Sequence, residues 1–151
     1  MLAVVSAACA DDTNDTMAAA GSGGGASNGG GAGAAATVDY NGCAAANYSD
    51  RSDSSAERIV VMGGSGLVYT PKCMRIAVGQ SVSWTGSFLA HPLAPGNPQD
   101  SKSGSASNPI QPTATGQSAE FTFSKAGTYP YYCTLHGLGT GQGMAGVIDV
   151  R

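Results

Sequence analysis

Charged residues are scarce in this sequence, at 11% of its 151 residues, and none of its seven Lys and Arg residues precedes Arg51. The basic residues from that point on are scattered rather than clustered. A protein that binds nucleic acid needs a basic patch or stripe, so the sequence argues against this class of partner. An apolar pattern of helical period is also missing throughout, which argues against an α-helical domain.

The first third of the chain has little bulk, because it consists mostly of Ala, Gly, Asn, Ser and Asp. Residues 9–37 contain "DDTNDTMAAAGSGGGASNGGGAGAAAT", which has no apolar periodicity and cannot repay the entropy lost on ordering. We expect a disordered Gly/Ala-rich linker, with a reach of roughly 30 Å for a coil of this length. It would either tether a domain away from a membrane surface or be a low-complexity tail with no role. Residues 38–151 remain for one folded domain.

A short apolar stretch, "MLAVVSAA", precedes Cys9. It is similar to the end of a bacterial lipoprotein export signal with its acceptor cysteine, so residues 1–8 are predicted to be the remnant of a longer export signal. Two features depart from that pattern: no basic residue precedes Cys9, and Ser6 stands where such signals usually carry Leu. Cys9 is therefore either a lipidation site or an ordinary cysteine near a cleavage site.

The rest of the sequence is rich in β-branched and aromatic residues, in short runs separated by Gly and Pro turns. Met74, Ile76 and Val78 alternate with less apolar residues, as on a strand with one buried face, and Val82 and Trp84 follow the same period. Many short strands predict an all-β Greek-key sandwich of about 7–8 strands. Strands are expected at residues 58–62, 88–93, 120–124, 128–133 and 147–150, with others around 67–78 and 82–84 and a surface loop over 94–116.

A thiol, an imidazole and a thioether lie close together in the glycine-rich stretch "CTLHGLGTGQGMAG", which begins at Cys133. In the preceding "TYPYYC", a strand period of two puts Tyr129, Tyr131 and Cys133 on one face, so the thiol is expected to point inward. His136 is expected just past this strand, and Met144 just before the final strand. Two strand ends joined by one loop can bring these three donors to one point at the rim of the sandwich.

His91, in "FLAHPLAP", is the other histidine of the chain and also stands at a predicted strand end. A thiolate, two imidazoles and a weak thioether form the donor set of a type 1, or blue, copper site, which suits both Cu(I) and Cu(II). Taken singly, these residues have ordinary interpretations. Cys133 could be a buried apolar residue or half of a disulfide, the histidines could be surface residues, and Met144 could fill the core. Their joint spacing favours copper.

The domain resembles a cupredoxin, and specifically a plastocyanin, in "GLVYTPKCMRIAVGQSVSW", "FLAHPL" and "AGTYPYYCTLHGLGTGQGMAGVIDV". These stretches cover most of the chain after residue 66, apart from the loop 94–116. The resemblance implies that His91, Cys133 and His136 are the equatorial ligands of one copper ion and that Met144 is the axial ligand. It also implies that His136 is the more exposed ligand, through which electrons leave.

One departure from the plastocyanin pattern concerns the loop between His136 and Met144. Seven residues, "GLGTGQG", intervene there, more than plastocyanins usually have. The extra glycines either let the loop bulge while Met144 keeps its place, or they loosen the axial bond. Leu138 is expected near a docking face around His136.

Cys43 and Cys73 are the natural disulfide pair among the remaining cysteines. Cys73 is expected on the outward face of its strand, so the bond would hold the segment around "NGCAAANY" on the outside of the sandwich. A second, thiol-based metal site is the competing interpretation, which the lack of a nearby histidine disfavours.

Together these observations predict a one-electron carrier with one copper ion per chain, monomeric and periplasmic or otherwise extracytoplasmic. Redox partner proteins would dock near His136, and the membrane would be contacted only through an anchor at Cys9. A copper carrier or sensor without electron-transfer turnover is the alternative. An enzyme is disfavoured, because copper oxidases and nitrite reductases need further histidines for a second copper centre. A dinuclear copper site would need a second cysteine beside Cys133.

Overall fold

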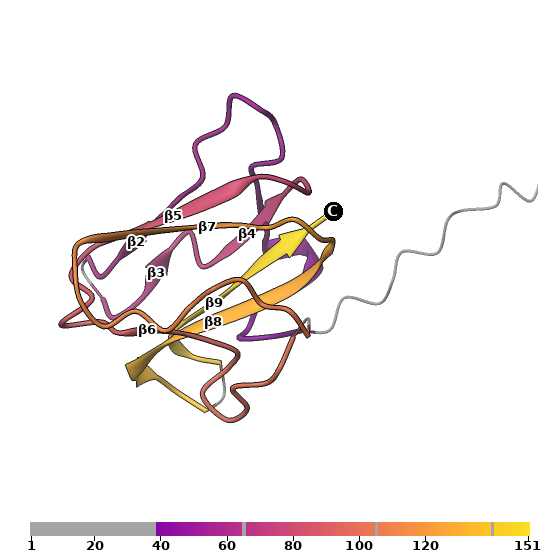
Figure 1. Cartoon of the computed structure of the whole chain (residues 1–151). Helices are drawn as coiled ribbons and strands as arrows, with labels where there is room; N and C mark the ends of the chain where they lie inside the picture. The colour runs from indigo at the N-terminus through magenta and orange to yellow at the C-terminus, as the bar shows by residue number, and fades with distance from the viewer. Residues whose placement is uncertain (1–38, 65, 105, 140) are drawn as a thin grey trace, which may run out of the picture. The chain divides into compact units, whose positions relative to one another are not determined.

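The computed structural model describes residues 39–151 apart from 65, 105 and 140. The predicted export signal, the linker and Cys9 lie outside the described residues. The described part contains nine strands and one short 3-10 helix, η1 (Ala45–Asn47) (Figure 1). In this part of the chain no helix is long and apolar enough to cross a membrane. The strands are β1 (Ser49–Asp50), β2 (Ile59–Met62), β3 (Tyr69–Thr70), β4 (Cys73–Ile76), β5 (Ser81–Thr85), β6 (Leu93–Pro95), β7 (Ser118–Thr122), β8 (Gly127–Gly137) and β9 (Gly143–Val150).

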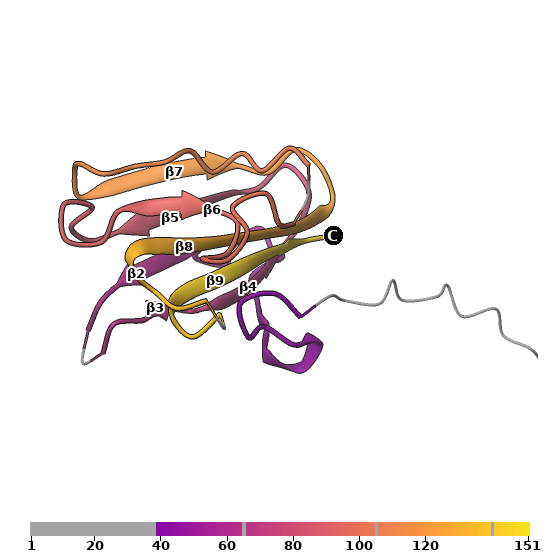
Figure 2. The same cartoon turned by 90° about the horizontal axis from the view of Figure 1, so that it is seen from below.

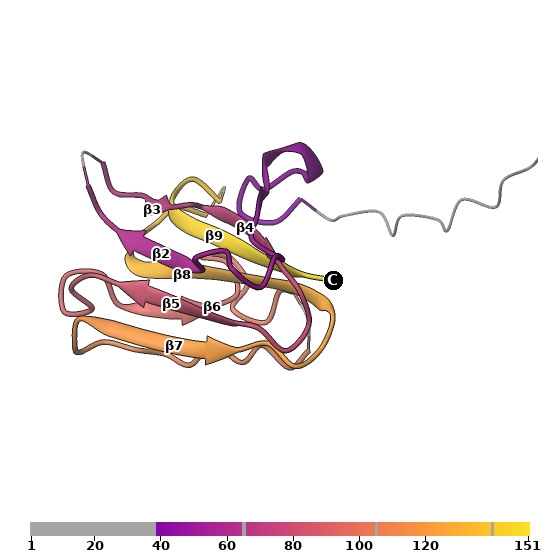
Figure 3. The same ribbon diagram turned by 90° about the horizontal axis from the view of Figure 1, so that it is seen from above.

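The strands form two sheets that pack face to face (Figures 2 and 3). The larger sheet has the order β1-β4-β9-β8-β6 and the smaller has the order β3-β2-β5-β7. β9 runs parallel to β4 and antiparallel to β8. Consecutive strands such as β4 and β5 lie in different sheets, so the prediction of an all-β sandwich is confirmed. The described residues contain nine strands rather than the predicted 7–8. The difference comes from β1 and β3, which are only two residues long and too short to recognise from the sequence pattern.

The core lies between the sheets, on the faces that the period-two pattern predicted to be inward. Val82, Trp84, Tyr129, Tyr131 and Cys133 are each at most 2% exposed. The indole of Trp84 meets the ring of Tyr131 edge to face, with 5.2 Å between centroids. At the start of β8, the hydroxyl of Tyr129 donates a hydrogen bond to the backbone oxygen of Lys125 at 2.8 Å. This bond satisfies a buried hydroxyl and fixes the entry into the strand.

The predicted disulfide between Cys43 and Cys73 is confirmed, with 5.6 Å between the Cα atoms. It holds the segment of residues 40–50 beside β4 and β9 (Figures 2 and 3). Cys43, Cys73 and Val147 form a small buried cluster there, separate from the main core, against which Tyr40 and Tyr48 pack. The outward face of β4 and β9 is therefore covered by the chain itself.

The strand predicted for "FLAHPL" is wrong. The chain from Phe88 makes a turn closed by a hydrogen bond from His91 N to Ser87 O at 2.9 Å, and β6 begins only at Leu93. The turn buries Phe88 completely and leaves Leu89 78% exposed. A short apolar run fits either a strand or a buried turn, and the periodicity of the sequence does not separate the two.

Val78 was expected on a buried face but is 48% exposed. The strand that should carry it, β4, ends at Ile76. Gln80 N then donates to Ala77 O at 3.2 Å, and Gly79 takes a φ of +87°. The turn therefore begins earlier than the alternation suggested, and Val78 lies on it.

Candidate metal centre

Cys133 points into the core from β8 and is fully buried, as predicted. Its partner across the sheet is Leu93 of β6, in an antiparallel pairing. Residues just before Leu93 therefore lie next to residues just after Cys133. Among the cysteines of the described residues, Cys133 is the one outside a disulfide.

The two histidines approach each other through this pairing. His91 precedes β6, and Thr134 N donates to Pro92 O at 2.9 Å, which fastens the two segments together. His136 lies inside β8 rather than just past it. The register between β8 and β9 shifts over this stretch, an irregularity of the kind that redirects side chains at a strand end.

The structure brings His91, Cys133 and His136 together, with their ligand atoms all within 4.8 Å of one another. Nδ1 of His91 lies 3.1 Å from Nδ1 of His136, which in turn lies 3.5 Å from Sγ of Cys133. The imidazole rings are tilted by 57°, with 4.9 Å between centroids. Two imidazole nitrogens this close must share a proton or a metal ion, because their lone pairs repel.

Burial lowers the pKa of His91, and the neighbouring His136 lowers it further. A lowered pKa favours the neutral imidazole, which is the form that binds metals. Both histidines are half-buried, whereas Cys133 is fully buried. The imidazole rings are therefore the parts of the cluster nearest to solvent.

Met144 is the second residue of β9 and is fully buried in the same core cluster as Cys133. It thus lies inside the strand rather than just before it. Its place in the core agrees with both interpretations of its thioether, as an axial ligand and as a packing group. Its role as a ligand stays a prediction.

The loop between His136 and Met144, which we call the ligand loop (residues 137–143), closes as a hairpin. Gly137 pairs with Gly143 across the β8–β9 ladder. Within it, Leu138 N donates to Gln142 O at 3.1 Å, and Gly141 N donates to Leu138 O at 2.9 Å. Gly143 has a φ of +68°, and a side chain there would collide with the backbone oxygen of His136. The additional residues are therefore taken up in a turn, and β9 begins immediately after it.

Two contacts of the ligand loop were not anticipated. Lys72 donates from Nζ to Gly141 O at 2.9 Å, and Asn41 lies against Gly141. Burial lowers the pKa of Lys72. No motif marks either residue, because both meet the loop only through the tertiary fold, across sequence separations of 69 residues or more.

Exposed leucines flank both histidines in the sequence. Leu89, Leu135 and Leu138 are 78%, 65% and 57% exposed. Leu89 comes two residues before His91, and the other two stand on either side of His136. These three side chains are therefore solvent-exposed apolar residues close in sequence to the candidate ligands.

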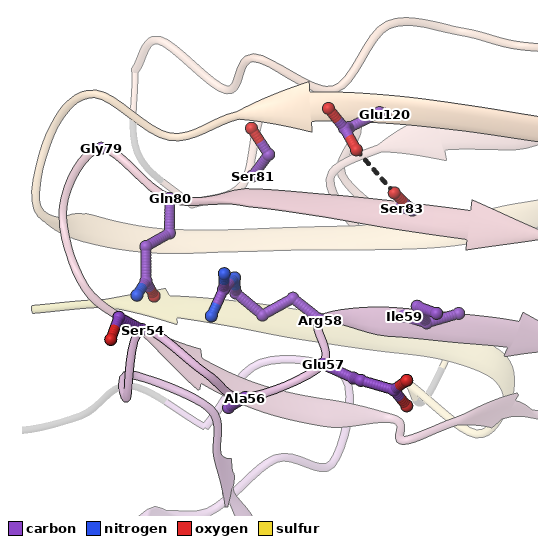
Figure 4. Close-up of a pocket in the computed structure, with 10 residues that line it drawn as sticks. All are labelled: Ser54, Ala56, Glu57, Arg58, Ile59, Gly79, Gln80, Ser81, Ser83 and Glu120. Carbon is purple, nitrogen blue, oxygen red and sulfur yellow. Dashed lines mark hydrogen bonds between the residues drawn. The ribbon is translucent and has the colours of Figure 1, made fainter.

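A separate open depression of about 570 Å³ lies on the outer face of the smaller sheet (Figure 4). Its lining includes Arg58, Gln80 and Glu120, and Ser83 Oγ donates to Glu120 Oε2 at 2.8 Å. None of the candidate ligands lines it. It is therefore distinct from the cluster of His91, Cys133 and His136.

The donor set fits copper. A thiolate is a soft ligand and imidazole is a borderline one, and together they bind both oxidation states of copper. In this cluster the buried thiol of Cys133 supplies the soft ligand, and the imidazoles of His91 and His136 supply the two borderline ligands. The three residues can hold one copper ion.

Comparison with known proteins agrees with this chemistry. The sequence model of the family described as "Copper binding proteins, plastocyanin/azurin family" matches residues 56–151. Among solved structures, the chain is similar to amicyanin from Paracoccus versutus at 20% identity, over 64% of this chain and 83% of that chain, with a TM-score of 0.42.

It is also similar to a purple cupredoxin from Nitrosopumilus maritimus at 22% identity, over 63% of this chain and 100% of that chain, with a TM-score of 0.41. A copper-containing nitrite reductase from Thermus scotoductus SA-01 is similar at 24% identity, with a TM-score of 0.41. That match spans 63% of this chain but 22% of the reductase. The segment of residues 40–50 precedes the region that the family model matches.

Proposed function

Because the chain belongs to the plastocyanin/azurin family of copper-binding proteins, we propose that it is a mononuclear type 1 copper protein that carries single electrons between redox partners. The observation that carries this proposal is the convergence of a buried thiol and two imidazoles within 4.8 Å. A bound copper ion would supply the one-electron couple between Cu(I) and Cu(II).

We assign His91, Cys133 and His136 as equatorial ligands and Met144 as the axial ligand. The scaffold supports this role because each donor is held by elements that pack into one core. Cys133 and His136 share β8, and His91 is fastened to β8 through the hydrogen bond from Thr134 N to Pro92 O at 2.9 Å. Donors fixed in this way need little rearrangement when the charge on the metal changes, which favours fast electron transfer.

Electrons would leave through His136, with partner proteins docking on the apolar surface beside it. The half-buried imidazole and the exposed side chains of Leu135 and Leu138 support this assignment. An apolar rim around a ligand ring can be desolvated by a partner without breaking charged pairs, which suits a short-lived complex.

An electron carrier is favoured over an enzyme, because the sequence holds two histidines and both lie in this cluster. No imidazole is left for a second copper centre within this chain. We infer that the protein works outside the cytoplasm, since structural disulfides such as Cys43–Cys73 persist in oxidising compartments. We also propose that it works as a monomer. Cys9 is the proposed lipid anchor.

The test is to add Cu(II) to the full chain and record visible absorption and electron paramagnetic resonance. We expect an intense thiolate-to-copper band, which Cys133→Ser should abolish. Absence of the band in the wild-type protein would end the proposal, and its survival in the variant would end the assignment of Cys133. Stopped-flow electron exchange then separates the two functions, because slow exchange would favour a copper carrier or sensor.

The axial assignment has a matched control within the chain. Met144 and Met62 are both buried, at 0% and 7% exposure, and Met→Leu conserves volume at either position. Met144→Leu should change the reduction potential and the paramagnetic spectrum, whereas Met62→Leu should leave both unchanged. The reverse result would remove Met144 from the ligand set.

A further inference from the structure

A turn that precedes the family-matched region lies against the strands that carry the candidate ligands. Asn41, at its centre, is 5% exposed and has a φ of +51°. Its Nδ2 donates to Gly146 O at 2.9 Å and to Tyr131 O at 3.0 Å, with a longer contact to Gly96 O at 3.4 Å. One side-chain amide therefore links β8, β9 and the end of β6.

These contacts lie close to the candidate ligands along both strands. Tyr131 and Gly146 are paired across the β8–β9 ladder. Tyr131 is two residues before Cys133, and Gly146 is two residues after Met144. The amide of Asn41 thus bridges β8 and β9 two residues away from the candidate ligands Cys133 and Met144.

The same turn also touches the ligand loop directly. Gly141 is buried with a φ of +72°, and a methyl group built on it would lie 2.5 Å from Cα of Asn41. Only glycine permits this approach. Lys72 Nζ donates to Gly141 O at 2.9 Å, and Lys72 directly precedes the disulfide-bonded Cys73.

On the other side, the loop packs against the turn after β6. A methyl group built on Gly139 would lie 2.9 Å from the side chain of Gln99, and one built on Gly137 would lie 2.9 Å from Pro98. The ligand loop is therefore held between two external turns. Asn41 in the N-terminal turn makes hydrogen bonds to the ligand-bearing strands and approaches Gly141 closely, and Lys72 makes the hydrogen bond to the loop.

We propose that Asn41 and Lys72 are positioning residues for the metal centre: they hold the ligand loop in place, and thereby the distance of Met144 from the metal. The effect on copper rests on the proposed function, whereas the effect on the loop does not. A longer loop rich in glycine has more conformations to lose than a short one. The contacts of Lys72 and Asn41 with Gly141 restrict the conformations of the loop.

The first arm of the test uses the copper-free full chain and measures hydrogen exchange at the amides of Leu138 and Gly141. Lys72→Met keeps the aliphatic stem and removes the donor, and Asn41→Gly keeps the left-handed backbone and removes the amide. We expect exchange at both loop amides to become roughly tenfold faster in each variant. Lys72→Arg should restore slow exchange, because the guanidinium can donate to the same carbonyl.

The control is Tyr129→Phe, which removes one buried hydrogen bond at the other end of β8. It should lower the melting temperature without selectively changing loop exchange. Equal acceleration in the control, or unchanged loop exchange in Lys72→Met, would overturn the proposal. Should Asn41→Gly fail to fold, the half-buried Lys72 still decides the outcome.

The second arm uses the copper-loaded protein. Lys72→Met and Asn41→Gly should shift the reduction potential and the paramagnetic spectrum, and Lys72→Arg and Tyr129→Phe should not. An unchanged spectrum with a loosened loop would refute control of the metal while leaving the loop contact standing. A wild-type protein with no thiolate band would instead refute the proposed function, and the exchange arm would still decide whether these residues hold the loop.

Discussion

The outer faces of the two sheets differ in what covers them. β9 of the larger sheet is buried on both sides, with every residue from Met144 to Val150 buried, whereas β2 of the smaller sheet alternates exposed and buried positions. Ile59 and Val61 on the outer side of β2 are 41% and 48% exposed. Val147 on the outer side of β9 is fully buried beneath the disulfide.

The difference shows that a strand buried on both faces needs a cover, and this chain supplies one from residues 40–50. That segment also brings Asn41 to the ligand-bearing strands. The covered face therefore combines two tasks, stabilising the sandwich and holding the ligand loop. The outer face of the smaller sheet, which we call the bare face, has exposed residues such as Ile59 and Val61 and performs neither task. Equivalent substitutions on the covered and bare faces should therefore change the stability of the protein by different amounts.

The largest effect is expected from removing the disulfide with Cys43→Ser and Cys73→Ser together. The bond closes a loop with a sequence separation of 30 residues. In the chain-entropy account, its loss lowers the free energy of unfolding by about 3–4 kcal/mol. Chemical denaturation measures this directly. A loss below about 1 kcal/mol would mean that packing alone holds the cover, against the usual effect of such bonds.

A smaller loss is expected for Asp149→Asn on the covered face. The Asp149 side chain is 3% exposed and accepts hydrogen bonds from Nε of Arg75 at 2.9 Å and Nε of Arg151 at 3.0 Å. Losing a buried charged acceptor should cost about 1–3 kcal/mol, toward the lower end because water still reaches both arginines. Glu120→Gln is the control on the bare face, where the exposed carboxylate should matter by less than about 0.5 kcal/mol. Equal losses would contradict the comparison.

The covered face should also respond to alkaline pH through Tyr48. Burial, followed by the charge of Asp149, raises the pKa of Tyr48 from 10.0 to about 12. The folded state therefore holds the phenolic proton to higher pH than the unfolded state, so this contribution is complete below pH 10 and is lost as pH rises toward 12. Tyr48 is half-exposed, which limits the contribution to about 1 kcal/mol.

The measurement for Tyr48 is the difference in unfolding free energy between the wild-type protein and Tyr48→Phe across this pH range. Other tyrosines titrate in both proteins and cancel in the difference. The wild-type protein should lose more stability than the variant between pH 10 and 12. Parallel curves would show that the environment of Tyr48 does not stabilise its neutral form.

The smallest effect is expected for Val61→Thr on the bare face, within about 0.5 kcal/mol. Its matched partner is Val147→Thr, which puts a hydroxyl into the buried cluster beside the disulfide and should cost about 1–2 kcal/mol. Thermal or chemical unfolding of both variants gives the contrast. A larger loss at Val61 than at Val147 would reverse the assignment of covered and bare faces.

Much of the fold was predictable, because the alternation of apolar and polar residues along a strand indicates which of its faces is buried. This holds for β5 and for the part of β8 that ends at Cys133. It fails at Phe88, where a buried turn and a short strand share the same apolar run. It also fails for the cover, since the disulfide could be assigned from cysteine usage but the hydrogen bonds of Asn41 and Lys72 could not.

By itself, the sequence predicted the all-β class, the disulfide partners and, with the resemblance to cupredoxins, the candidate copper ligands, because these depend on residue type and on the pattern of the motifs. Only the tertiary structure decided how His91 meets Cys133 and His136 and how the seven residues after His136 close into a hairpin. It also decided that Asn41 and Lys72 contact Gly141. These features arise from pairing and packing between segments far apart in the chain. Such contacts depend on the shape of the whole domain, which no local pattern encodes.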